Sequence, residues 1–261
     1  MSIKLVAVDM DGTLLNNKKE MPADFIPWVK NHPEIKTVIA SGRQYYTLEK
    51  DFLPVRDRLI FIAENGGLVF EKGEIIFKDP MKKEDILNCL DIVEQIPLAE
   101  AIVCGAKAAY FKEPDEVMRY NAEMYYKSHE IVEDLRQVPD RDTIIKIAVF
   151  VREHKAEETM QYFKNPGKNL SSVLSGPSWI DVANVTESKG NAVKAIQERY
   201  HIRPEESMAF GDYLNDLTLI KSCTESYCMK NGHPVLKDAS KYVTEKTNDE
   251  EGVMEVLKKI I

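Results

Sequence analysis

Long apolar runs, an excess of basic residues and abundant cysteine are all missing from this 261-residue sequence. No stretch is apolar over the length that spans a bilayer, and the first residues lack the basic, apolar and small-residue succession of a secretory signal. Acidic residues outnumber basic ones by 43 to 35, for a formal net charge of -8. Nucleic acids and anionic membranes require a basic footprint, so we expect a cytoplasmic protein that binds neither of them.

The few cysteines form no recognisable metal or redox pattern. None of the four belongs to a CxxC or Cys/His spacing, and their positions are Cys89, Cys104, Cys223 and Cys228. We predict reduced and mostly buried thiols, with a Cys223–Cys228 disulfide as the less favoured alternative. The remaining composition, 44% hydrophobic and 30% charged residues, is typical of a globular protein with a well-buried core.

Two aspartates stand at the end of the first apolar run. The run is short, its apolar residues are Ile3, Leu5, Val6, Ala7 and Val8, and a Gly-Thr turn halts it, which favours a buried strand of a parallel sheet over a helix. Asp9 and Asp11 follow this strand directly. In open α/β sheets ligands bind at the carboxyl ends of the strands, so both carboxylates are candidate active-site groups.

Later apolar runs end in polar residues in the same way. The predicted strand over 36–40 ends at Ser41-Gly42-Arg43, the one over 59–63 at Glu64-Asn65-Gly66-Gly67, and the one over 207–210 at Gly211 followed by Asp212. Helical segments alternate with these strands, and a further helix begins at Ser188-Lys189-Gly190. The alternation predicts an α/β fold with a doubly wound parallel sheet.

The middle of the chain follows another pattern. From about residue 81 helices and strands no longer alternate, which predicts an α+β unit of about a hundred residues with its own small core. We expect residues 1–80 and 184–261 to form a discontinuous catalytic core, and 81–183 to form an inserted lid or cap. The connections near Asp79-Pro80 and 182–187 are the expected hinges.

Together the polar residues supply what phosphoryl transfer requires: a nucleophile, a cation site, donors for the phosphate oxygens and an acid for the leaving group. Asp9 and Asp212 suit Mg²⁺, which prefers oxygen ligands, and Asp9 can attack phosphorus. Asp11 can act as acid and base, while Ser41 and Lys189 bind phosphoryl oxygens. Singly, each group has an ordinary explanation as a turn aspartate, a helix cap, a solvated lysine or a helix-terminal charge pair.

Four segments in order resemble the motifs of the haloacid dehalogenase (HAD) superfamily of phosphatases. They are Asp9-Met10-Asp11-Gly12-Thr13-Leu14, Ser41-Gly42-Arg43, Lys189-Gly190 and Gly211-Asp212-Tyr213-Leu214-Asn215-Asp216. The insertion between the second and third motifs resembles that of Cof-type sugar phosphatases with a C2B cap, as do Asn65-Gly66-Gly67, Asn231-Gly232 and the segment 248–252. Met10 and Gly232 are small departures, from Leu or Ile and from Ala respectively.

The resemblance implies a Rossmann-like core, Mg²⁺ dependence, Asp9 as nucleophile and Asp11 as general acid and base. It implies metal ligation by Asp9, by the Asp11 main-chain carbonyl and by Asp212, with Asp216 supporting metal-bound waters. Further binding roles fall on these residues: Ser41, Gly42 and Lys189 for phosphate, and Asn215, Asn65 and Arg43 for the rest of the substrate. The implied reaction is hydrolysis of small phosphate monoesters, such as sugar phosphates or related metabolites, through an aspartyl-phosphate.

Other functions remain open at this point. A phosphomutase or phosphotransferase of the same superfamily shares the motifs, a receiver-like phospho-signalling module shares the Asp, Ser and Lys, and a binding protein can keep the fold without chemistry. The leaving group should be selected by the insertion, whose candidate contacts are Tyr110, Arg119, Tyr125, Tyr126, Lys146 and Trp179. A monomer or a weak homodimer is expected.

Overall fold

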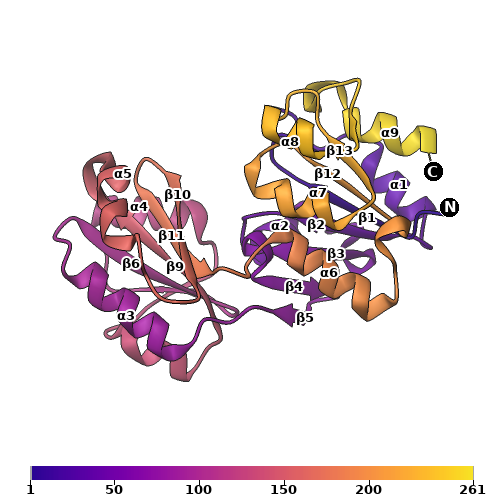
Figure 1. The fold of residues 1–261 in the computed structure, drawn as a ribbon. Helices are drawn as coiled ribbons and strands as arrows, with labels where there is room; N and C mark the ends of the chain where they lie inside the picture. Colours follow the sequence, from indigo (N-terminus) through magenta and orange to yellow (C-terminus); the bar gives the residue numbers. More distant parts are fainter. Residues whose placement is uncertain (1, 261) are drawn as a thin grey trace. The chain divides into compact units, whose positions relative to one another are not determined.

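The computed structural model describes residues 2–260, and the chain divides into two compact units (Figure 1). One unit combines the segments before Asp79 and after Glu187, and the other is Asp79–Glu187. The role of the second unit as a cap stays a prediction.

The first unit is built on an eight-stranded sheet in the order β14-β13-β12-β1-β2-β3-β4-β5. Its strands are β1 Leu5–Asp9, β2 Lys36–Ala40, β3 Leu59–Ala63, β4 Leu68–Glu71, β5 Glu74–Lys78, β12 Ser207–Gly211, β13 Glu225–Cys228 and β14 Tyr242–Val243. The strands from β14 to β3 run parallel, and the β4–β5 hairpin is antiparallel. Strand β1 is buried along its whole length, as expected for an apolar strand covered on both faces.

Helices cover both faces of this sheet. They are α1 Phe25–Asn31, α2 Tyr45–Asp51, α6 Lys189–Tyr200, α7 Leu217–Ser222, α8 Pro234–Ala239 and α9 Gly252–Ile260. Side chains of α6 and α7 pack with Leu5 and Ala7 on one face. On the other, the ring of Phe52, at the end of α2, lies 5.9 Å from that of Phe61 and 6.1 Å from that of Phe25. This arrangement confirms the predicted doubly wound α/β core.

Strand β1 lies where the strand order reverses. The chain proceeds from β1 to β2 and β3 on one side, and from β12 to β13 and β14 on the other. In the parallel register Asp9 is opposite Ala40 and Val8 is opposite Phe210. The residues that follow these strands therefore emerge at one edge of the sheet, at a switch point of the kind where open α/β sheets bind ligands.

The second unit is an α+β layer with a six-stranded sheet in the order β10-β11-β9-β6-β7-β8. Its strands are β6 Ala99–Gly105, β7 Ala109–Phe111, β8 His129–Ile131, β9 Ile144–Val151, β10 Leu170–Gly176 and β11 Trp179–Asn184, and its helices are α3 Lys83–Glu94, α4 Glu116–Tyr125 and α5 Ala156–Thr159. Residues of α3 pack with Ile147 and Val149, while residues of α4 pack with Ala148 and Phe150, so helices cover both faces of this sheet too.

Several elements differ from the sequence prediction. Pro22 suits the first turn of a helix, but the helix begins only at Phe25, because a turn closed by the Phe25 amide and the Pro22 carbonyl (3.0 Å) precedes it. The sequence also predicts a helix from Lys155 to Phe163, and this segment forms a single α-helical turn followed by the 3-10 turn Met160–Phe163. Strands β8 and β14 escaped prediction because both are short and exposed. All four cysteines are buried and free, which confirms the predicted reduced thiols.

The two segments that lead into and out of the second unit are joined by Asp79. Its Oδ1 accepts a hydrogen bond from Asn184 Nδ2 (2.8 Å), and its Oδ2 accepts one from Thr186 Oγ1 (2.6 Å). The predicted hinge segments are therefore hydrogen-bonded to each other, and hinge motion stays a prediction.

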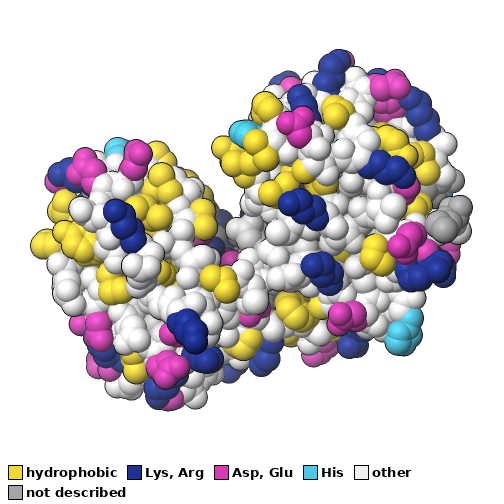
Figure 2. All heavy atoms as spheres, in the orientation of Figure 1, with side chains coloured by type: hydrophobic (Ala, Val, Ile, Leu, Met, Phe, Trp, Pro, Cys, Tyr) yellow, Lys and Arg dark blue, Asp and Glu magenta, His cyan; other side chains and the backbone are white. Residues whose placement is uncertain are grey.

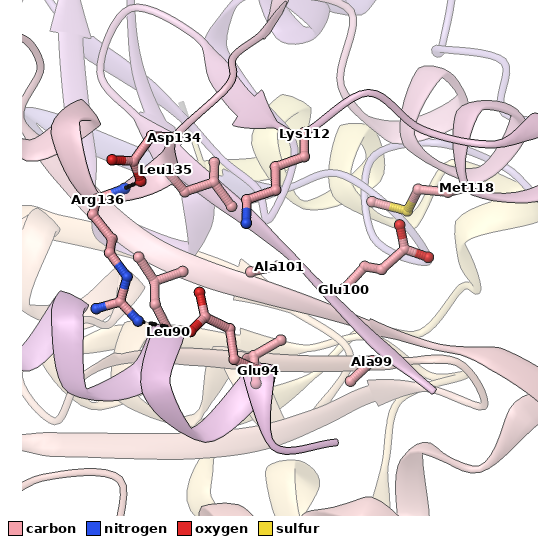
Figure 3. Close-up of a pocket in the computed structure, with 11 residues that line it drawn as sticks. Leu90, Glu94, Ala99, Glu100, Ala101, Lys112, Met118, Asp134, Leu135 and Arg136 are labelled. Carbon is pink, nitrogen blue, oxygen red and sulfur yellow. Dashed lines mark hydrogen bonds and ion pairs between the residues drawn. The ribbon is translucent and has the colours of Figure 1, made fainter. Parts of the chain in front are cut away.

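A cavity of about 140 Å³ lies within the second unit, between α3, β6 and the loop after β8. Figure 3 shows its apolar floor, including Leu90 and Ala101, and the charged groups around it. Two of these charged groups, Arg136 and Glu94, form an ion pair (2.8 Å). No residue of the predicted site lines the cavity.

Surface charge is mixed on both units. Figure 2 shows acidic and basic side chains interspersed on the face in view. Within residues 2–260, no helix combines the length and apolar character that crossing a membrane requires.

A first prediction concerns the contact between α6 and α7. A Cβ added at Gly190 would lie 2.2 Å from the Thr218 carbonyl oxygen, which is main chain and cannot rotate away. Gly190→Ala should lower stability by about 1–3 kcal/mol, because overpacking forces the two helices apart. Calorimetric melting would measure the change. Gly176→Ala is the control, since its new Cβ would meet its nearest atom at 3.6 Å; equal melting temperatures for the two variants would contradict the prediction.

Candidate active site

Three carboxylates converge at the carboxyl edge of the first unit's sheet. Asp9 ends β1, Asp212 follows β12, and Asp216 closes the 3-10 turn η7 (Leu214–Asp216). One oxygen from each lies within 4.8 Å of the others. Asp9 and Asp216 are buried, with exposed fractions of 5% and 1%. The structure thus gathers three of the predicted site residues into one acidic cluster.

Lys189 is the counter-charge of this cluster. It is the first residue of α6, whose start is capped by Ser188 Oγ accepting from the Asn191 amide (3.2 Å). The fully buried Lys189 ammonium donates to Asp9 Oδ1 (2.5 Å) and to Asp216 Oδ1 (2.7 Å). Burial alone would lower the lysine pKa, but the two carboxylates outweigh burial and raise it above its ordinary value. Lys189 is therefore a cation.

Asp216 also fixes the loop that carries Asp212. Its second oxygen, Oδ2, accepts hydrogen bonds from the main-chain amides of Asp212 (3.0 Å) and Tyr213 (3.2 Å). Both oxygens of Asp216 are thus engaged, one by Lys189 and one by the loop. This arrangement makes Asp216 a support for the cluster and leaves Asp9 and Asp212 as the more available oxygen donors.

The residues present fit a divalent cation. Among the described residues no donor reaches Asp9 Oδ2, although this oxygen is buried. Burial and the neighbouring Asp216 raise the pKa of Asp9, and the same causes raise that of Asp212 to about 6. Three carboxylates face one ammonium, so the cluster has an excess of negative charge that a metal ion would offset. An all-oxygen donor set suits a hard cation.

Asp11 has a different environment from Asp9. Arg43 grips it with two hydrogen bonds, Nε to Oδ2 (3.0 Å) and Nη2 to Oδ1 (2.7 Å), and Lys19 Nζ adds a third to Oδ1 (2.8 Å). Its side chain is 39% exposed. Burial would raise the pKa of Asp11, but the bonds from Lys19 and Arg43 outweigh burial and lower it. Asp11 is consequently ionised, the form that can accept a proton.

Arg43 was predicted to contact the substrate, and in the structure its guanidinium pairs with Asp11. Two other predicted substrate contacts lie together, since Asn215 Nδ2 donates to Asn65 Oδ1 (3.3 Å). A Cβ at Gly42 would lie 3.0 Å from Asn65 Nδ2, so glycine permits this close approach. Ser41 is buried just beyond β2, where its hydroxyl accepts from the Arg43 amide (3.2 Å). The binding roles assigned to these residues stay predictions.

Several residues that contact the site have no role predicted from the sequence. Lys19 lies in the polar segment 16–19 after the first strand, and it pairs with Asp11. Thr13 Oγ1 donates to Asp212 Oδ1 (3.3 Å), and Asn231 Nδ2 donates to the Gly12 carbonyl (2.8 Å). No periodic signal marks these residues, because each acts through loop geometry. The family resemblance includes Thr13 and Asn231 in its motifs but gives neither of them a role.

Most candidate leaving-group contacts in the insertion belong to its interior. The buried ones are Tyr110, Tyr126, Lys146 and Trp179. Lys146 Nζ lies 3.4 Å from a carboxylate oxygen of Asp181. Of the remaining two, Arg119 pairs with Glu113 at the surface, and Tyr125 is 54% exposed. Packing thus accounts for the three buried aromatics.

Comparison with known proteins identifies the family. The family model described as haloacid dehalogenase-like hydrolase matches residues 6–257. The chain belongs to this family. The 5-amino-6-(5-phospho-D-ribitylamino)uracil phosphatase YbjI of Escherichia coli (strain K12) is 30% identical across 100% of this chain and 97% of its own. YwtE of Bacillus subtilis (strain 168), a phosphatase named for the same substrate, is 26% identical across 96% of each chain.

Solved structures agree with this assignment. SMU.1108c from Streptococcus mutans UA159 has a TM-score of 0.83 and 28% identity, covering 99% of this chain and 98% of its own. The HAD subclass IIB sugar phosphatase BT4131 is similar in fold, with a TM-score of 0.76 and 21% identity over 99% of this chain and 100% of its own. The predicted superfamily and the predicted class of enzyme, a HAD-type phosphatase, are confirmed.

The ion network yields a second prediction. Lys189→Met leaves the Asp9 and Asp216 carboxylates buried without their counter-charge, so stability should fall by about 3–5 kcal/mol, as when one member of a buried ion pair is removed. Denaturant unfolding would measure the loss.

Two further variants separate charge from packing. Adding Asp216→Asn to Lys189→Met removes one of the stranded charges and should restore part of the lost stability. Lys194→Met, an exposed position on the same helix, is the control. The electrostatic explanation is wrong if the double variant is less stable than Lys189→Met alone.

Proposed function

We propose that this HAD-family enzyme is a Mg²⁺-dependent phosphatase that hydrolyses small phosphate monoesters through an aspartyl-phosphate on Asp9. The observation that carries the proposal is the state of Asp9. It is buried at the switch point of the sheet, one oxygen bound to Lys189 and the other without a protein donor among the described residues. A carboxylate fixed in this way is oriented for attack, and the acidic cluster beside it suits a cation.

The proposed reaction has two displacements at phosphorus. In the first, Asp11 takes up the proton that a monoanionic phosphate ester carries. Asp9 then bonds to phosphorus, the bond to the leaving oxygen breaks, and Asp11 passes this proton to that oxygen. In the second, water bonds to phosphorus, Asp11 takes a proton from it, and the bond to Asp9 breaks to release inorganic phosphate. A bound Mg²⁺, held by Asp9, Asp212 and the Asp11 main-chain carbonyl, would neutralise charge on the phosphoryl group.

Lys189 has a donor to spare for the substrate. An ammonium has three N–H groups, and two are engaged by Asp9 and Asp216. We assign the third to a phosphoryl oxygen, together with the Ser41 hydroxyl and the Gly42 segment. The pairing of Asp11 with Arg43 and Lys19 favours its ionised form, which is the form required to activate water in the second displacement.

The proposed substrates are sugar phosphates or related phosphorylated metabolites. Two relatives are named for a phosphate ester on a ribityl chain, so 5-amino-6-(5-phospho-D-ribitylamino)uracil and hexose and pentose phosphates are the first compounds to screen. We assign the choice of leaving group mainly to residues 81–183, the predicted cap, because Asp9, Ser41 and Lys189 in the core would meet only the phosphoryl group.

The activity itself is the third prediction. Purified protein should release p-nitrophenol and inorganic phosphate from p-nitrophenyl phosphate with Mg²⁺, lose activity with a chelator and regain it when Mg²⁺ is returned. Asp9→Asn should abolish release while keeping the fold, monitored by circular dichroism. An inactive wild type across a broad ester panel sinks the hydrolase proposal. Isomerised monoester in place of free phosphate would indicate the phosphomutase alternative.

A fourth prediction separates the roles of Asp9 and Asp11. Asp11→Asn should still form the aspartyl-phosphate from p-nitrophenyl phosphate, whose leaving group needs little protonation, but should hydrolyse it about 10²–10⁴-fold more slowly. Rapid mixing should then show a burst of one p-nitrophenol per active site before slow turnover. With a sugar phosphate, whose leaving alkoxide must be protonated, the same variant should show no burst of free sugar. Steady turnover at the wild-type rate would exclude Asp11 as the base.

A further inference from the structure

One loop contacts the main chain on both sides of the acidic cluster. It comprises residues 229–233, directly after β13. Asn231 Nδ2 donates to the Gly12 carbonyl (2.8 Å), and the His233 amide donates to the Asp212 carbonyl (2.7 Å). Gly12 follows Asp11, and Asp212 is a candidate metal ligand. The loop thus joins the turn after β1 to the turn after β12.

Asn231 is itself held in one orientation. Its Oδ1 accepts a hydrogen bond from the main-chain N–H of Asn248 (3.0 Å), so its side-chain NH₂ group must face the Gly12 carbonyl. Asn248 is buried, with 3% of its surface exposed, and its own Nδ2 donates to the Leu15 carbonyl (3.0 Å). Asn231 and Asn248, which lie more than two hundred residues beyond the turn after β1, therefore each donate a hydrogen bond to a main-chain carbonyl of that turn.

Glycines make these contacts close. Gly12 has φ +82°, and a Cβ on it would lie 2.3 Å from Asp212 Oδ2. A Cβ on Gly232 would lie 2.5 Å from Cys228 Sγ and 3.0 Å from the Asp212 carbonyl. The departure at position 232, glycine where similar proteins often have alanine, thus has a physical reason here. Because the turn after β1 packs this closely against Asp212, a shift of the supporting loop 229–233 would change the position of Gly12 relative to Asp212.

We propose that Asn231 is a positioning residue for the active site. Through its bond to the Gly12 carbonyl it fixes the turn that bears Asp11 relative to Asp212, and Asn248 orients it for this task. The inference rests on the proposed function for its activity readout. Its magnesium readout does not, because metal binding is measured without substrate.

The sharpest variant is Asn231→Asp. It keeps the acceptor for the Asn248 amide and the shape of the side chain, but it loses the donor to Gly12. Asn231→Ala removes both bonds, and the exposure of this residue favours a folded variant. The control is Asn31→Ala, because Asn31 is an exposed asparagine at the end of α1 and lies in neither turn.

Both Asn231 variants should lose about 10–100-fold in kcat on p-nitrophenyl phosphate or in Mg²⁺ affinity, the usual cost of removing a group that orients a metal site. KM and the melting temperature without metal should change little. Mg²⁺ affinity is read from the metal concentration that half-maximally raises the melting temperature. Saturating Mg²⁺ should recover part of any lost kcat, whereas a general loss of folding would not respond.

The outcomes separate the two proposals. Wild-type kcat and Mg²⁺ affinity in Asn231→Asp would overturn the positioning role, as would an equal loss in Asn31→Ala. A wild type that binds Mg²⁺ but releases no phosphate would contradict the proposed function alone. The positioning role of Asn231 would still be tested, because the Mg²⁺ affinity of its variants can be measured without substrate.

Discussion

The site depends on one buried ammonium. Lys189 bonds to Asp9 and Asp216 in the interior of the first unit, where an isolated charge of either sign would be costly. Its partners lie 180 and 27 residues away in sequence, so their pairing requires β1, the start of α6 and the η7 turn to be in place together. Lys189 is also the second residue of the first unit after the insertion. The ion pairs therefore join the start of α6, where the chain returns to the first unit, to the end of β1 and to the η7 turn, so the site is complete only when these elements are packed together.

Two aspartates separated by one residue differ because of what surrounds them. Burial and Asp216 penalise the charge on Asp9, whereas Lys19 and Arg43 stabilise the charge on Asp11. When different surroundings give two aspartates different pKa values, the same residue type can serve two chemical roles. In Asp9 the penalty is offset by Lys189 and, in our proposal, by a cation. In Asp11 the exposed position leaves the carboxylate accessible to water. In the proposed mechanism, position along a single turn thus separates the nucleophile from the proton carrier.

The sequence predicted the residues that are set by strand geometry. Asp9 and Asp212 follow apolar runs, and parallel strands deliver such residues to one edge whatever the loops do. Contacts between loops were beyond prediction. Asn231 and Gly12 are 219 residues apart, and their bond depends on turn conformations that no hydrophobic period encodes. The grip of Arg43 on Asp11 is of the same kind. In the second unit the segment predicted as a helix over 155–163 is helical, but it tightens from an α-helical turn to a 3-10 turn after Thr159.

Asp79 gives the insertion a property that its size would not suggest. The segments that lead into and out of it are hydrogen-bonded side by side, to Asn184 and Thr186, so more than a hundred residues leave and return through a narrow neck. Lengthening a loop whose ends are already together adds little closure entropy. The length of the insertion therefore adds little to the entropic cost of folding the first unit, which permits the segment between these bonds to differ in size or sequence while the sheet that carries the site stays the same.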